Sequence, residues 1–261
     1  MIQNKAVKST ALALLKGNWA NAVFAGIAPV ATAVIIFLAG SLLDLPIGTF
    51  SGIIVVIALL FILSPLNMGV LRYFWRMSNE CKDSPVEIFY YFSSLSAYRR
   101  VMNFNIKITF RVILGAVIFS LPATVVATIT SESFYEFIGS ATPLWVLSFK
   151  TLVVILQIAG YIATVAYLIS LYLPAFLMVA NEDMTADECI RHGIKIGRYT
   201  KVKFANIVFS YIGWIILTIL AVPCLFTMPY LLMSYVVSCR FLVARHNMLA
   251  DKINGVPKHE I

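Results

Sequence analysis

Apolar residues gather in six long runs along the chain, separated by shorter connectors that carry nearly all of the charge. The runs cover about 22–40, 52–71, 106–129, 151–179, 204–226 and 227–243. A helix needs roughly 17–25 predominantly apolar residues to cross a bilayer, and each run reaches that length. The pattern predicts an all-α polytopic membrane protein with six transmembrane helices.

Proline and amide side chains mark special positions within these runs. Pro223 and Pro229 flank the junction of the last two runs, and we expect a tight hairpin there because proline breaks helices. Amides inside a membrane either hydrogen-bond between helices or line a cavity beside a broken helix. The candidate helix-break or cavity residues are Pro65, Asn67, Gln157, Pro174 and Pro229.

The charges lie overwhelmingly on one side of the predicted membrane. Of the 20 Lys and Arg residues, all but Lys150 lie before the first run, at or after the end of the last, or in and beside the second and fourth connectors. The opposite connectors carry Asp44, Glu132 and Glu136. Because cytoplasmic loops are rich in Lys and Arg, this distribution predicts a multi-pass protein of the bacterial cytoplasmic membrane with both termini in the cytoplasm.

The basic connectors have a pattern of their own. Ser84–Glu87 and Thr185–Glu188 fit the capping box that begins a helix, and apolar and basic positions then lie on separate faces. With residues 5–16, they predict three amphipathic helices in the cytoplasmic headgroup layer. One interfacial helix and two spans would then repeat as 1–76, 83–180 and 184–246 within a single integral-membrane domain, 1–261.

Several motifs carry a resemblance to a known family. They are Asn181-Glu182-Asp183, Gly197-Arg198, Phe209 to Trp214, Met228-Pro229-Tyr230, Leu15 to Trp19, and Pro65 to Gly69 with Arg72. The chain resembles an uncharacterised bacterial integral-membrane family catalogued as domain of unknown function 975. The resemblance implies six inner-membrane helices, similar in outline to the membrane domain of some glycerophosphodiester phosphodiesterases, and brings no catalytic residues. Val222-Pro223-Cys224 departs from the glycine-rich turn expected there.

Composition and motif content exclude several functional classes. Hydrophobic residues make up 61% of the chain and charged residues 12%, which is about half the usual charged share. The net charge of +8 collects beside the membrane, which argues against nucleic acid as a partner. No run contains Asp, Glu or His, and the sequence has no H-E-x-x-H, G-x-S-x-G, P-loop or C-x-x-C motif. We therefore expect a protein that is not an enzyme and holds no metal or cofactor.

One polar stripe enters the third run. Asn103, Lys107 and Arg111 follow one another at intervals of four residues, so they share a helical face. They either bind a phosphate or carboxylate group or extend their cations to lipid headgroups. The full set of candidate anion or lipid-headgroup contacts is Asn103, Lys107, Arg111, Arg72, Arg76, Arg191, Lys195 and Arg198.

Two functions remain compatible with these features. The basic and aromatic connectors beside catalytically empty spans favour a non-enzymatic membrane protein that organises or senses anionic lipid or a partner membrane protein. The alternative is a small permease or lipid-handling carrier with a cavity near the inner leaflet. The prolines and the Lys107–Arg111 stripe support this second interpretation.

Overall fold

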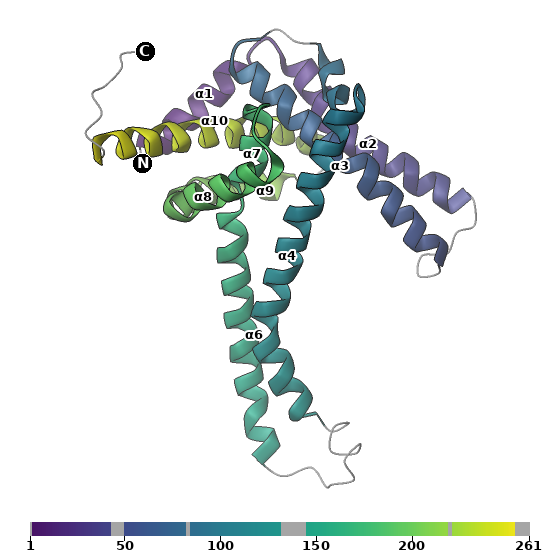
Figure 1. Ribbon diagram of the computed structural model, residues 1–261, viewed down its shortest axis with the longest axis vertical. Helices are drawn as coiled ribbons and strands as arrows, with labels where there is room; N and C mark the ends of the chain where they lie inside the picture. Colours follow the sequence, from purple (N-terminus) through teal and green to yellow (C-terminus); the bar gives the residue numbers. More distant parts are fainter. Residues whose placement is uncertain (1, 43–49, 82–83, 132–144, 219–220, 254–261) are drawn as a thin grey trace. The chain divides into compact units, whose positions relative to one another are not determined.

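The regular structure of the chain is helical throughout the part that the computed structural model describes, residues 2–42, 50–81, 84–131, 145–218 and 221–253 (Figure 1). The elements are α1 (Ile2–Leu15), α2 (Trp19–Leu42), α3 (Phe50–Ser78), η1 (Pro85–Phe92), α4 (Leu95–Ile129), α6 (Trp145–Ser170), α7 (Leu173–Ala180), α8 (Ala186–Phe209), α9 (Ile212–Leu217) and α10 (Ala221–Ile253). The predicted all-α class is confirmed. Asp44, Glu132 and Glu136 lie outside the described residues.

Four described stretches are long and apolar enough to cross a membrane. They are Trp19–Gly40, Leu95–Ile129, Thr151–Ala180 and Pro223–Asn247. They coincide with the first, third, fourth and sixth apolar runs of the sequence. Length and composition thus indicate a membrane-embedded protein with four candidate spans.

The prolines affect the helices differently. The helix break expected at Pro174 is present, because α6 ends at Ser170 and α7 begins at Leu173 with the proline in its first turn. Helix α3 continues through Pro65, and α10 continues through Pro229. Pro65 and Pro229 therefore do not end their helices.

The hairpin predicted between Pro223 and Pro229 is wrong. α10 is continuous across it, whereas the run 204–226 is divided where α8 ends at Phe209 and α9 ends at Leu217. Pro223 falls in the first turn of α10, where a backbone N–H has no intrahelical partner to lose. Pro229 lies inside the helix, and its ring packs against α2, 3.5 Å from the position of a Cβ atom at Gly26.

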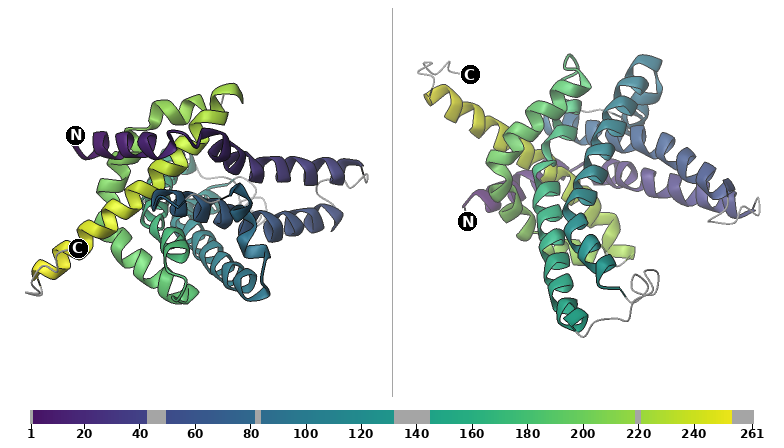
Figure 2. Two further views of the ribbon diagram at one scale, coloured as in Figure 1. Left: turned by 90° about the horizontal axis from the view of Figure 1, so that it is seen from above. Right: turned by 60° about the horizontal axis from the view of Figure 1, so that its bottom comes forward.

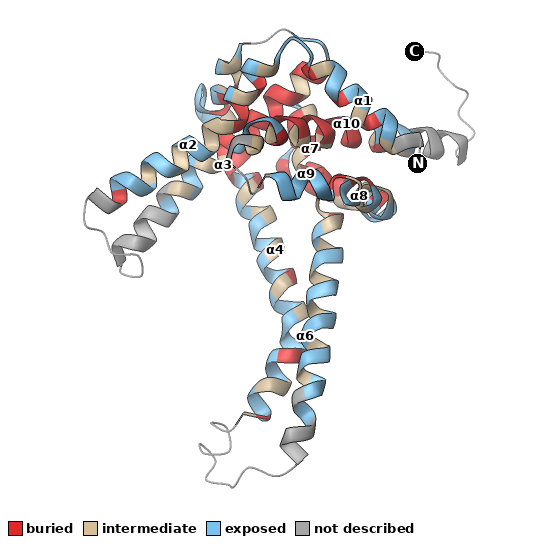
Figure 3. Ribbon diagram, turned by 180° about the vertical axis from the view of Figure 1, so that it is seen from behind, coloured by how far each residue is buried: buried red, intermediate tan, exposed pale blue. Residues whose placement is uncertain are grey.

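The chain divides into two compact units, and the first comprises Met1–Asn105 and Tyr172–Ile261. Within it α10 contacts α1, α2, α3 and α8, and α2 lies beside α3 (Figures 1 and 2). Buried residues gather on α10, α7 and the second half of α3 (Figure 3). The core of this unit therefore surrounds α10.

The apolar stripes of the two long connector helices face this core. On α1 the side chains of Val7, Ala11 and Leu15 are buried, and α1 packs on α10. On α8 the side chains of Cys189 and Ile190 are buried, and α8 packs on α7. These two stripes are consequently occupied by protein, not by the headgroup layer as the sequence pattern predicts.

The second unit, Ile106–Leu171, is a hairpin of the remaining part of α4 and α6 (Figure 1). The two helices approach closely at Gly160, where a Cβ atom would lie 2.6 Å from the carbonyl oxygen of Phe119. Large apolar side chains such as Phe110, Ile118 and Ile162 are exposed along it. Such a surface suits contact with lipid.

A substitution at Gly69 tests the close contact between α3 and η1. A Cβ atom at Gly69 would lie 1.8 Å from the carbonyl oxygen of Ile88, so Gly69→Ala must displace η1. We expect a loss of roughly 1–3 kcal/mol in the free energy of unfolding, as for other overpacked sites. Thermal unfolding in a mild detergent, followed by circular dichroism, measures the change.

Gly213→Ala on α9 is the matched control, because no atom lies within 4 Å of its Cβ position. This variant should leave stability unchanged or raise it by up to about 1 kcal/mol. Equal unfolding temperatures for the two variants would contradict the packing of η1 on α3.

Candidate functional site

The short helix η1 presents three different faces. A 3₁₀ helix has three residues per turn, so side chains three apart lie directly above one another. Ile88 and Tyr91 are buried, and burial raises the pKa of Tyr91 to about 12. A polar line contains Glu87 and Tyr90. The remaining line is apolar and exposed, and it consists of Val86, Phe89 and Phe92; Leu95, the first residue of α4, is exposed as well.

Glu87 has a different role from the one that its motif predicts. Ser84 begins η1 as its N-cap, and its hydroxyl accepts a hydrogen bond from the backbone N–H of Val86 at 3.4 Å. The Glu87 carboxylate instead pairs with Arg72 at 3.2 Å and with Arg76 at 3.8 Å. The predicted capping box therefore gives way to a long-range ion pair.

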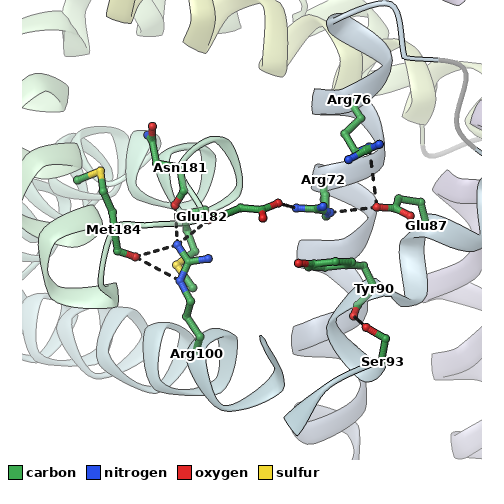
Figure 4. Close-up of polar contacts among 10 residues, drawn as sticks. Arg72, Arg76, Glu87, Tyr90, Ser93, Arg100, Asn181, Glu182 and Met184 are labelled. Carbon is green, nitrogen blue, oxygen red and sulfur yellow. Dashed lines mark hydrogen bonds and ion pairs between the residues drawn. The ribbon is translucent and has the colours of Figure 1, made fainter. Parts of the chain in front are cut away.

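Arg72, near the end of α3, is the centre of the site. Its side chain is only 6% exposed. The guanidinium donates from Nε to Glu87, donates from Nη1 to Glu182, and lies 3.6 Å from the centre of the Tyr90 ring (Figure 4). Burial acts to lower the pKa of Arg72, but hydrogen bonds to Glu182 and Glu87 outweigh it and the pKa lies above its ordinary value. Arg72 is therefore a permanent cation.

Arg100, in the first turns of α4, holds the loop between α7 and α8. Its Nη2 donates to the carbonyl oxygens of Asn181 at 2.6 Å and Met184 at 2.8 Å, and its Nε donates to Met184 at 3.2 Å (Figure 4). Carbonyls beyond a helix C-terminus have no intrahelical partner, and a guanidinium supplies several donors in one plane. Arg72 thus binds this loop through the Glu182 side chain, and Arg100 binds it through backbone carbonyl oxygens. We call this set of contacts the arginine junction.

The second predicted capping box is confirmed at the start of α8. The Thr185 backbone N–H donates to the Glu188 carboxylate at 2.9 Å, and the Glu188 N–H donates to the Thr185 hydroxyl at 3.3 Å. Hydrogen bonds from the backbone and the hydroxyl of Thr185 lower the pKa of Glu188. The box fixes where α8 begins, directly after the loop held by Arg100.

An open surface cavity of about 470 Å³ lies beside the arginine junction, and most of the residues that line it are exposed. Its lining comes from the first turns of α4 and from the α7–α8 loop with the start of α8. The lining residues are Arg99, Arg100, Asn103, Glu182, Asp183, Met184, Thr185 and Ala186. Both signs of charge meet there, so the cavity suits a polar or charged ligand.

The structure separates the predicted cationic contacts into different environments. Asn103 lines the cavity, and Lys107 is half-buried. Arg111 is exposed and lines a separate groove of about 420 Å³ in the helical hairpin, together with aromatic side chains. Arg72 is committed to internal ion pairs, whereas Arg76 is half-buried. On α8, the predicted contacts Arg191, Lys195 and Arg198 are all exposed.

The amides predicted within the spans are both exposed. Asn67 lies on α3, two residues after Pro65. Gln157 lies on α6, donates to the Tyr161 hydroxyl at 3.4 Å, and lines a groove of about 610 Å³ in the hairpin. Three hydroxyl residues of α4 line the same groove: Ser120, Thr124 and Thr128. Among the described residues, no group of three His, Cys, Asp or Glu side chains is arranged to hold a metal ion.

Sequence reasoning missed the partners that complete the junction. Glu182 is part of a motif that carries the family resemblance, but nothing in the sequence pairs it with Arg72, 110 positions away. Arg99 had a detectable signal, because it lies four residues before Asn103 and extends the same helical stripe. Tyr90 had only the general signal of an aromatic residue near cations.

Comparison with known proteins gives one result. A family model described as "Protein of unknown function (DUF975)" matches residues 1–245. The chain belongs to this uncharacterised family. No curated protein and no solved structure matches the chain. The match covers the whole arginine junction, so the junction lies within the family domain.

Replacing Arg72 tests whether the junction stabilises the fold. Arg72→Ala removes the hydrogen bonds to Glu87 and Glu182, whose side chains are 27% and 54% exposed, and hydrogen bonds to charged groups contribute about 1.5–3 kcal/mol. We expect a corresponding fall in the midpoint of thermal unfolding in detergent, measured by circular dichroism.

Arg76→Ala is the matched control, because Arg76 pairs with the same carboxylate but its side chain is 37% exposed. An exposed pair contributes less than about 1 kcal/mol. If Arg76→Ala destabilised the protein as much as Arg72→Ala, the assigned role of Arg72 would be wrong.

Proposed function

We propose that the protein is a non-enzymatic integral membrane protein of the bacterial cytoplasmic membrane that organises or senses its lipid surroundings. The observation that supports this best is the cavity beside the arginine junction, whose lining keeps charged and amide groups that the fold does not use. A partner membrane protein is the other candidate from the sequence. It becomes an outcome of the tests below.

The exposed face of η1 supports a lipid partner. Val86, Phe89 and Phe92 are exposed apolar side chains spaced three residues apart on the segment that also supplies Glu87 to the junction. Apolar side chains next to cations are typical of protein surfaces that enter the headgroup layer. The apolar stripes of α1 and α8 are buried. Among the described connector helices, η1 therefore offers exposed apolar side chains to the headgroup layer.

The proposed topology keeps six crossings with both termini in the cytoplasm. Beside the four candidate spans, α3 and the divided segment 204–226 would supply the two remaining crossings. The support is the charge distribution along the sequence, which places the connector containing Cys81 in the cytoplasm.

Cysteine labelling tests this orientation with a native residue. Cys81 is exposed, Cys189 and Cys239 are buried, and burial raises the pKa of the Cys189 thiol. In a Cys224→Ser background, a membrane-impermeant maleimide should label Cys81 only after sealed spheroplasts are lysed. The control is Cys81→Ser in the same background, which should remain unlabelled. Labelling of Cys81 in sealed spheroplasts would reverse the topology.

A second function is favoured by the groove in the α4–α6 hairpin. Its Gln157 amide and its hydroxyl side chains are polar groups on helices of membrane-spanning composition. Polar groups at membrane depth often mark the path of a substrate. This groove supports the small permease or lipid-handling carrier.

Reconstitution distinguishes the two functions. If the protein organises lipid, phospholipid should co-purify with it and raise its unfolding temperature, and liposomes loaded with inorganic phosphate should retain it as protein-free liposomes do. Phosphate efflux that is abolished by Arg111→Ala or Gln157→Leu would instead establish the carrier. Recovery of a stoichiometric protein partner without stabilisation by lipid would favour the partner over the lipid.

A further inference from the structure

The cavity beside the arginine junction contains two kinds of charged group, those that the fold uses and those that it leaves free. Arg100 is committed to backbone carbonyls, and Glu182 is committed to Arg72. Arg99, Asn103 and Asp183 are exposed, and their side chains make no hydrogen bond or ion pair within the described part of the chain. A ligand would therefore meet one free cation, one free amide and one free carboxylate.

The two side chains that are free to donate hydrogen bonds lie on the same face of α4. Arg99 and Asn103 are four residues apart on α4, so they occupy one helical face. Ala186, the first residue of α8, also lines the cavity, and the first N–H groups of a helix have no intrahelical acceptor. A guanidinium, an amide and a helix start together suit a phosphate group.

The remaining free group, the Asp183 carboxylate, calls for a positive charge in the ligand. Asp183 would repel a ligand that was only anionic, because its carboxylate has no cation of its own. The lining as a whole carries two arginines and two acidic residues and is electrically balanced. A ligand with one negative and one positive group satisfies both free charges, whereas an anionic lipid of the kind expected from the sequence satisfies only one.

We propose that this cavity binds a phosphate diester joined to a primary amine, as in the head group of an ethanolamine phospholipid. The phosphate accepts hydrogen bonds from Arg99 and Asn103, and the ammonium group donates to Asp183. A primary amine fits better than a quaternary one, because only N–H groups can donate to the carboxylate. The inference rests on the proposed function and names the lipid chemistry that it would recognise.

The experiment compares lipids with matched acyl chains but different head groups. The delipidated full chain in a maltoside detergent is titrated with phosphatidylethanolamine, phosphatidylglycerol or phosphatidylcholine, and separately with soluble glycerophosphoethanolamine. Native mass spectrometry measures bound lipid, and thermal unfolding measures stabilisation. We expect phosphatidylethanolamine to bind best and to raise the unfolding temperature most. Stabilisation by the soluble compound at equal concentration would assign the site to a free metabolite of the same chemistry and overturn the lipid as its source.

The variants separate the two halves of the head group. Arg99→Gln should weaken binding of all three phospholipids by about tenfold, the effect of losing one charge-assisted hydrogen bond. Asp183→Asn should weaken phosphatidylethanolamine by a similar factor and leave phosphatidylglycerol unchanged or improved. Arg245→Gln is the matched control, because Arg245 is an exposed arginine of α10 that does not line the cavity.

The outcomes distinguish this inference from the function on which it rests. Equal binding of phosphatidylethanolamine and phosphatidylglycerol, with no effect of Asp183→Asn, would overturn the amine site but leave a lipid-binding protein. Equal losses in Arg99→Gln and Arg245→Gln would place the lipid elsewhere on the basic surface and also overturn the site. If no phospholipid bound or stabilised the protein, the proposed function would fail as well.

Discussion

Arg72 is the constraint on which the connector region depends. A guanidinium that is removed from water must find compensating charge, because an unpaired buried ion costs several kcal/mol. Its partners come from η1 and from the α7–α8 loop, which are far apart in the sequence. The ion pairs therefore form only when α3, η1 and that loop are all in place. Arg100 then fixes the same loop through its carbonyls, so two arginines determine the geometry of one cavity wall.

The connector helices divide their apolar surfaces between protein and surroundings. α1 and α8 bury their stripes against α10 and α7, whereas the third face of η1 remains exposed. Burial of apolar area is the main favourable contribution to packing, so the first two helices belong to the fold itself. The basic face of α8, with Arg191, Lys195 and Arg198, remains exposed and available to headgroups. The connectors thus form a packed layer with a charged outer surface.

The sequence predicted what depends on local composition and missed what depends on distant partners. The apolar runs predicted the helical class and six spans, of which four coincide with candidate spans, and the Thr185 capping box was right because both of its hydrogen bonds are local. The proline rule failed at Pro229, because α10 continues through this residue while its ring packs against α2. Glu87 fitted a local motif and a long-range ion pair equally well, and the pattern could not show that Arg72 would compete for it. The threefold repeat stays a prediction.

The 3₁₀ geometry of η1 has a consequence for how this segment can change during evolution. With three residues per turn, inserting or deleting one residue turns everything that follows by a third of a revolution. The phenyl rings of Phe89 or Phe92 would then point at the Arg72 guanidinium, or a carboxylate would enter the packing beneath Ile88. Changes of length in multiples of three preserve the three faces. Family members should therefore vary this segment by whole turns or not at all, while they exchange residues freely along its outermost line.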